Sequence, residues 1–186
     1  MNQVAPQTDS TRLAAALADA YLLGRPLSND GVADLWVADD RKHGRPVVIK
    51  VLHPELSATL HRESFLREIA TLARLQHPHI LPLLDSGDRD GILYLVRPWV
   101  DGENLREHLE RHGPLPIGEA VRILADVTDA LAHAHARGVV HRDVRPENIM
   151  VANRHAMVSE FGIAHAATSW AANSRITAEL WATADE

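Results

Sequence analysis

The sequence has no cysteine and only two lysines, Lys42 and Lys50, while 17 other basic residues are arginine. The absence of cysteine excludes disulfides and thiolate chemistry. The net charge of −6 without a basic stripe makes nucleic acid an unexpected partner. No apolar run is long enough to cross a bilayer, and no signal-peptide core is visible, so the sequence indicates a cytoplasmic protein with no membrane segment.

Histidine is abundant, with 12 residues, but its spacing matches no familiar metal-binding motif. His133 and His135 lie two apart on a predicted helix and should point to different faces. His77 and His79 flank Pro78 in a predicted loop. No spacing resembles H-E-x-x-H or a zinc ribbon, so we expect no histidine metal site.

The most informative stretch is residues 141–148, which read H-R-D-V-R-P-E-N. It places Asp143 and Asn148 five positions apart, after a long helix with an apolar stripe. The stretch resembles the catalytic loop of protein kinases, H-R-D-x-x-x-x-N, and its ending resembles the serine/threonine branch. The resemblance implies that Asp143 accepts the proton of an incoming hydroxyl and that Asn148 holds magnesium against the phosphates of ATP. Arg145 stands where the family has a catalytic lysine.

Further kinase motifs stand in the same order as in the family. Residues 47–50, V-V-I-K, resemble the strand whose lysine pairs with the α- and β-phosphates, which makes Lys50 a catalytic candidate. A strand-end lysine that reaches solvent is the simpler alternative. Glu68 flanks an apolar stripe of helical period and matches the glutamate that holds this lysine. Residues 160–162, E-F-G, occupy the D-F-G position, so the chain is identified as a member of the bacterial Hanks-type serine/threonine kinases.

The resemblance implies an α+β, protein-kinase-like two-lobe fold, with a five-strand N-lobe sheet, a C-helix and an incomplete helical C-lobe. The expected parts are an N-terminal extension (1–20), the N-lobe (21–97), a partial C-lobe with the catalytic loop (98–165), and an activation-segment remnant or tail (166–186). The C-lobe is expected to be incomplete because the chain shows no A-P-E motif and none of the family's later helices.

Periodicity and turn residues predict the individual elements. Helices are expected at 13–21, 56–75, 104–111 and 117–137. Strands are expected at 22–27, 36–38, up to 50, 81–84 and 92–96, followed by a hairpin of 149–151 with 156–158. The long helix should bury one stripe of side chains, namely Val121, Leu124, Val127, Leu131 and Ala134.

The resemblance also implies an ATP pocket. Residues 98–102 would form the hinge, where the carbonyl of Pro98 and the N–H of Val100 face adenine; proline lacks an N–H but keeps its carbonyl. Magnesium would bind Asn148 and Glu160. The ATP-binding residues expected from the family are Leu27, Leu35, Val48, Lys50, Pro98, Val100 and Met150.

Two departures concern the phosphates. The glycine-rich loop reads S-N-D-G-V-A at 28–33, where Asp30 either lies near the phosphates or caps a turn and faces solvent. Glu160 keeps the charge of the D-F-G aspartate, but its extra methylene displaces the carboxylate, and octahedral magnesium tolerates little error. We therefore expect weakened metal binding.

A third departure lies at the back of the pocket. Arg97 occupies a position that is usually apolar in the family. A buried guanidinium needs a carboxylate partner, and Glu68 and Glu160 are the candidates. Alternatively, Arg97 extends past Trp99 into solvent.

These features leave three readings of the function. The first is an ATP-binding kinase-like domain whose phosphoryl transfer to a protein hydroxyl is weak or lost, as in a pseudokinase. The second is an active serine/threonine kinase with an unidentified protein substrate or regulator. The third is a non-functional fragment that cannot fold alone.

Overall fold

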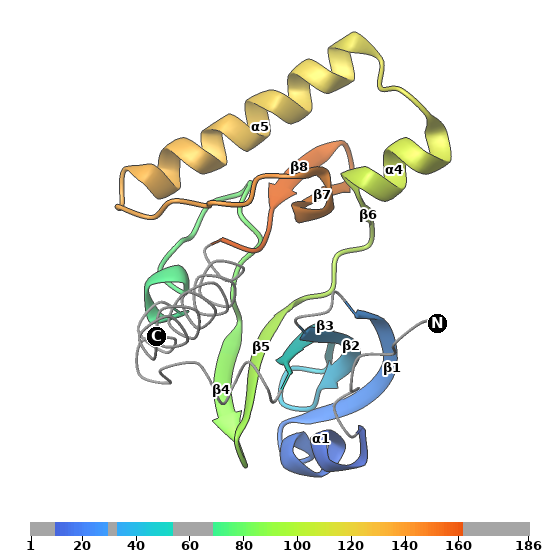
Figure 1. Cartoon of the computed structure of the whole chain (residues 1–186), viewed down its shortest axis with the longest axis vertical. Coiled ribbons are helices and arrows are strands. Elements are labelled where there is room, and N and C mark those ends of the chain that lie inside the picture. The colour runs from blue at the N-terminus through green and yellow to red at the C-terminus, as the bar shows by residue number, and fades with distance from the viewer. Residues whose placement is uncertain (1–9, 30–32, 54–68, 162–186) are drawn as a thin grey trace, which may run out of the picture.

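The computed structural model describes residues 10–29, 33–53 and 69–161, and the description that follows is of these residues. They form two parts that are joined by the segment 98–102. One part is a five-stranded antiparallel sheet with a helix packed beneath it, and the other holds two helices and a small three-stranded sheet (Figure 1). The five-strand sheet confirms the expected N-lobe sheet, and a hinge at residues 98–102 stays a prediction.

The N-lobe sheet has the strand order β1-β2-β3-β5-β4. Two of its inner strands, β3 and β5, are rich in β-branched and large apolar residues. Such residues favour strands that are covered on both faces. Helix α1 covers one face through Leu13 and Leu17, and Ile69 packs with residues of the other face. The bounds are α1 Ser10–Leu17, β1 Tyr21–Asn29, β2 Ala33–Asp40, β3 Arg45–Leu52, β4 Asp85–Arg89 and β5 Ile92–Pro98.

The strand expected at 81–84 is wrong, because the fourth strand is β4, which was expected to be a turn-rich segment. Asp90 and Gly91 both have positive φ and form the two-residue turn between β4 and β5. Such a turn matches the twist of a tight hairpin, so it pairs the polar residues of β4 with β5 despite their low strand propensity.

The C-lobe part is built around helix α5, which lies along the small sheet of order β6-β7-β8 (Figure 1). Helix α4 begins with a capping box, in which Asn104 and Glu107 each bond the other's backbone N–H. The bounds are β6 Glu103–Asn104, α4 Leu105–His112, α5 Ile117–His135, the 3₁₀ helix η1 Pro146–Asn148, β7 Ile149–Ala152 and β8 His155–Val158.

The buried face of α5 differs in part from the expected stripe. Val127 and Ala134 are buried as expected, but Val121 and Leu124 are 60% and 62% exposed. Ile123 and Ala130 take their places in the core. The helix is apolar on two adjacent faces, so periodicity alone could not decide which of them meets β8.

The segment 79–81 pairs with β8 in the C-lobe part. The N–H of Leu81 donates to the carbonyl of Val158 over 2.9 Å, and the N–H of Val158 donates to the carbonyl of His79 over 2.8 Å. Because Glu160 follows Val158 by two residues, these bonds fix the backbone just before Glu160.

Within the described ranges, no helix combines the length and the apolar character needed to span a bilayer.

Candidate functional site

A cavity of about 410 Å³ lies between the N-lobe sheet and the segment that leads into the C-lobe. Its size is in the range of pockets that hold small molecules, about 300–1,000 Å³. Apolar side chains line much of it, while its polar end carries an amine, an amide and a carboxylate. The lining includes Arg97 and nine of the residues expected to bind ATP or metal, namely Leu27, Leu35, Val48, Lys50, Pro98, Val100, Asn148, Met150 and Glu160.

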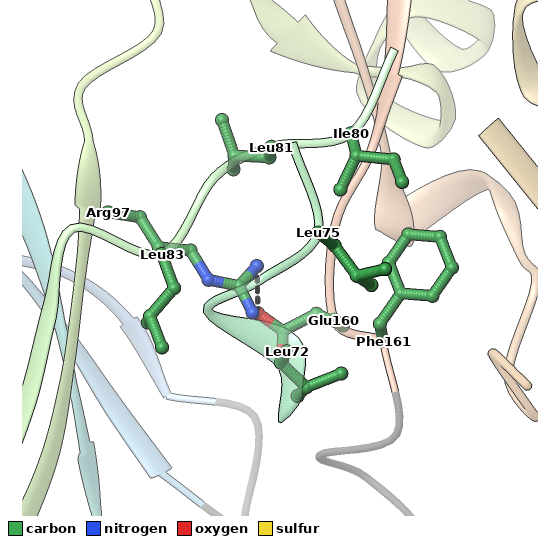
Figure 2. A pocket seen from close by; sticks show the side chains of 8 residues that line it. All are labelled: Leu72, Leu75, Ile80, Leu81, Leu83, Arg97, Glu160 and Phe161. Carbon is green, nitrogen blue, oxygen red and sulfur yellow. Dashed lines mark ion pairs between the residues drawn. The ribbon is translucent and has the colours of Figure 1, made fainter. Parts of the chain in front are cut away.

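Three charged side chains meet at the polar end of this cavity. Lys50, on β3, places its Nζ 2.9 Å from Oε2 of Glu160, and Arg97, on β5, places a guanidinium nitrogen 3.0 Å from Oε1. Figure 2 shows the guanidinium pointing at the carboxylate of Glu160, and only 10% of the Arg97 side chain is exposed. Of the alternatives for Arg97, pairing with Glu160 is therefore confirmed. Each oxygen of one carboxylate is bonded to a different cation.

This pairing controls the ionisation of Glu160. Burial alone would raise the pKa of its carboxyl, but the charges of Arg97 and Lys50 outweigh that effect and lower the pKa to about 2. Glu160 also has a φ of 62°, a backbone conformation that costs energy for a residue with a side chain. The carboxylate is thus fully ionised at neutral pH and held in a strained position.

A second, very small cavity of about 20 Å³ lies behind Arg97 (Figure 2). Leucines of the 69–84 segment and Phe161 line it, and the Arg97–Glu160 pair forms its polar side. The Nε of Arg97 is buried and finds no hydrogen-bond partner among the described residues. The cavity has room for about one water molecule.

The catalytic-loop residues form a separate network of hydrogen bonds. The Nδ2 of Asn148 donates to Oδ2 of Asp143 over 3.0 Å and to its carbonyl over 2.9 Å. The backbone N–H of Asp143 donates to Nδ1 of His141 over 3.2 Å. Asn148 lines the cavity, so these bonds link Asp143 to its wall.

His141 supports the loop from below and is almost fully buried. Its Nε2 lies 2.7 Å from the carbonyl of Ser159, and its ring centroid lies 4.5 Å from that of Phe161. Because Nδ1 accepts a hydrogen bond, Nε2 must carry the proton of the neutral ring. Burial lowers the pKa of His141, which keeps the ring neutral. The neutral ring is therefore packed inside the protein, between the loop and Phe161.

The remaining sequence candidates are placed differently. Arg145 pairs with Glu147 at 3.1 Å, its side chain is 54% exposed, and it is not among the cavity-lining residues. Its catalytic role remains a prediction. Glu68 and Asp30 lie outside the described residues, so the lysine–glutamate pair and the loop over the phosphates also remain predictions.

The structure adds cavity residues that the sequence analysis did not single out. Glu147 lines the cavity and accepts from both Arg145 and Arg106, each at 3.1 Å. Ser159 lines it too, and both its N–H and its hydroxyl donate to the carbonyl of Asn148. The only available signal was position, because Glu147 lies inside the catalytic-loop stretch and Ser159 directly precedes Glu160.

The arrangement suits a nucleotide better than it suits magnesium. An apolar slot with a cationic end can hold a base and its phosphates. A magnesium ion requires free oxygens in near-ideal octahedral geometry, but both oxygens of Glu160 are bonded to cations. Asn148 donates to Asp143 through its amide nitrogen, which leaves its amide oxygen for a metal. Glu160 therefore does not fit the ion in the arrangement observed.

Comparison with known proteins gives consistent matches. A model of the protein kinase domain matches residues 31–185. A probable serine/threonine-protein kinase, pknA2, from Bifidobacterium longum is 39% identical over 153 residues, which cover 80% of this chain and 20% of that protein. PknD, a serine/threonine-protein kinase of Mycobacterium tuberculosis, is 40% identical over 150 residues, which cover 80% and 23%. The chain thus spans about a fifth to a quarter of the length of these relatives.

Solved structures agree with the sequence matches. The crystal structure of the PknI kinase domain of Mycobacterium tuberculosis superimposes with a TM-score of 0.70 at 34% identity, covering 77% of this chain and 60% of that one. A structure of Rad53 with AMP-PNP gives a TM-score of 0.72 at 21% identity, over 79% and 39%, and supports the fold alone. The protein-kinase-like two-lobe fold expected from the sequence is confirmed, and the chain belongs to the protein kinase family, in its bacterial Hanks-type serine/threonine branch.

Proposed function

We propose that this chain binds ATP in the 410 Å³ cavity and that its transfer of a phosphoryl group to a protein hydroxyl is weak. The observation that carries the proposal is the double pairing of Glu160 with Lys50 and Arg97 at the polar end. Lys50 and the hinge suit the nucleotide, whereas the carboxylate that should hold the metal is engaged elsewhere.

Nucleotide binding would use both ends of the cavity. Leu27, Val48 and Met150 would enclose the base, while the carbonyl of Pro98 and the N–H of Val100 would bond its edge. At the other end, the ammonium of Lys50 and the guanidinium of Arg97 are both bonded to Glu160 and would reach the phosphates from there. Cations at this position would attract phosphates without help from a metal ion. In this proposal Arg97 supplies part of the positive charge that magnesium supplies in the family.

Phosphoryl transfer, where it occurs, would depend on the catalytic loop. Asp143, which accepts a hydrogen bond from Asn148, would orient a serine or threonine hydroxyl and accept its proton. When bound, magnesium neutralises charge that develops on the transferred group. Its binding would require the Arg97–Glu160 bond to break, and that requirement is our reason for expecting weak transfer. Because ATP is an intracellular metabolite, we extend the proposal to a cytoplasmic location.

An active kinase is the second candidate, and the Asp143–Asn148 network favours it. If the chain is active, transfer rates should depend steeply on magnesium, because the ion must compete with Arg97 for Glu160. The reading as a fragment that cannot fold alone predicts no cooperative thermal transition at all.

A thermal-shift experiment on the whole chain tests the proposal. Any ligand that binds the folded state alone raises the melting temperature in proportion to RT ln(1 + [L]/Kd). We expect ATP to raise it with EDTA present, and we expect magnesium to add little. An unchanged melting temperature with ATP, with or without magnesium, would contradict nucleotide binding. A large shift that appears only with magnesium would favour the active kinase.

A further inference from the structure

A second group of polar side chains lies away from the nucleotide cavity, where the 77–81 segment, α5 and β8 meet. His79, Asp126 and His155 each place one ligand atom within 4.8 Å of the other two. They come from three different segments. This is why motif spacing in the sequence gave no sign of them. Histidine nitrogens with one carboxylate oxygen are a ligand set that zinc and related transition metals prefer.

The first two ligands are already held in orientation by the backbone. Nδ1 of His79 lies 2.9 Å from the carbonyl of Ala156, an acceptor that places the ring proton on Nδ1 and leaves the lone pair on Nε2. Oδ2 of Asp126 accepts from the N–H of Ala156 over 2.9 Å, which leaves Oδ1 for a ligand. Metal-binding histidines are commonly fixed by such a bond to a carbonyl.

The separation of the two atoms fits a shared ion better than a direct hydrogen bond. Nε2 of His79 and Oδ1 of Asp126 are 3.5 Å apart. Two ligands at about 2.0–2.2 Å from a tetrahedral zinc lie roughly 3.4 Å from each other. Both side chains are largely buried, with 17% and 13% of their surface exposed. His155 is exposed, so its ring can adjust and leave the fourth position to water.

A comparable group, Glu103 with His108 and His112, is less suited to a cation. Oε1 of Glu103 lies 2.8 Å from Nδ1 of His108, and Oε2 lies 2.6 Å from the guanidinium of Arg111. A fixed positive charge on the same carboxylate repels a dication. This group therefore serves as the matched control.

We propose that His79, Asp126 and His155 bind a divalent transition metal of the zinc class, with three protein ligands and one open position. The metal would join the 77–81 segment to α5 and β8. The backbone of His79 and of Leu81 is hydrogen-bonded to Val158 of β8, which lies two residues before Glu160. A bound ion would thus stiffen the support of the nucleotide cavity without touching it.

The test is titration of the whole chain with Co²⁺, followed through its visible absorption, together with the thermal shift caused by Zn²⁺. We expect one ion per chain, a tetrahedral cobalt spectrum and a higher melting temperature. The variants are His155→Ala, which alters an exposed side chain, and Asp126→Asn, which keeps an acceptor for the N–H of Ala156. Loss of even an outer-shell partner costs about 10–100-fold in metal affinity, so each variant should weaken Co²⁺ binding by at least about tenfold.

The control is the double variant His108→Ala with His112→Ala, which should bind Co²⁺ like the parent. Three outcomes would overturn the proposal. These are no saturable binding by the parent, unchanged binding in both site variants, and loss of binding in the control instead.

Discussion

The catalytic loop and the charged group around Glu160 face the same cavity but are held together in different ways. In the loop, the amide nitrogen of Asn148 donates a hydrogen bond to the carboxylate of Asp143, and the neutral ring of His141 accepts one from the N–H of Asp143. At the other wall, Glu160 is bonded to two cations, Lys50 and Arg97. The loop is held by hydrogen bonds with an amide donor, while the charged group is held by ion pairs.

The difference teaches that the two regions can be perturbed separately. Asp143 and Asn148 lie within one short stretch of the chain and are bonded to each other. Lys50, Arg97 and Glu160 come from three separate segments, so the position of the carboxylate depends on how these segments meet. Substitutions in each region should therefore have distinct effects.

Removing the base should have the largest effect. In Asp143→Asn the asparagine keeps an oxygen that can accept from Asn148, so the loop should retain its shape. Any measured phosphoryl transfer should fall by about 10²–10⁴-fold, because the proton acceptor is lost. Radiolabel transfer from ATP to a generic protein substrate is the measurement. Asp19→Asn, a change at a side chain that is 94% exposed, is the control and should leave the rate unchanged. Transfer at the parental rate in Asp143→Asn would contradict the assigned role.

The second largest effect should be a loss of folding stability in acid, when the carboxylate of Glu160 is protonated. The pKa of Glu160 is lowered from its usual 4.5 to about 2, so its contribution to stability is present above pH 4.5 and is lost as the pH falls toward 2. A shift of this size corresponds to on the order of 3 kcal/mol. Urea unfolding between pH 6 and about pH 2.5 should show this loss in the parent, and a smaller loss in Arg97→Met. Equal acid sensitivity of the two proteins would mean that Arg97 does not set the pKa.

Shortening the carboxylate should have a smaller effect. In Glu160→Asp the carboxyl group retreats by about 1.5 Å, and bonds of 2.9 and 3.0 Å to Lys50 and Arg97 cannot both survive. The released oxygens then suit magnesium better. We expect the magnesium-dependent gain in ATP affinity to rise about tenfold, about 1.4 kcal/mol. Titration calorimetry with and without magnesium measures it. The same magnesium response in parent and variant would show that Glu160 has no metal role.

The parts of the protein that follow from local sequence were predictable. The catalytic loop, the hairpin of β7 and β8 and the capped helix α4 each depend on neighbours in the chain. The segment β4 was missed because its polar residues, Asp85 to Arg89, form a strand only through pairing with β5. Long-range pairing overrides local strand propensity.

The site followed the same rule. Part of the cavity lining could be named from motifs, because each motif has a known position in the family fold, whereas Glu147 and Ser159 were missed. The sequence offered Glu68 and Glu160 as partners of Arg97 but could not decide between them. The decision depends on how the segment after β8 approaches β5. The group of His79, Asp126 and His155 could not be predicted from the sequence, because its three residues lie far apart in the chain and match no metal-binding motif.

In the proposed function, the guanidinium of Arg97 supplies at Glu160 part of the positive charge that magnesium supplies in the family. The most direct test compares ATP affinity with magnesium and with EDTA, in the parent and in Arg97→Met. In the parent the two affinities should be nearly equal. In the variant, magnesium should improve ATP binding by about fivefold, less than in Glu160→Asp because the longer side chain still misplaces the carboxylate. An identical ratio of the two affinities in both proteins would contradict the account.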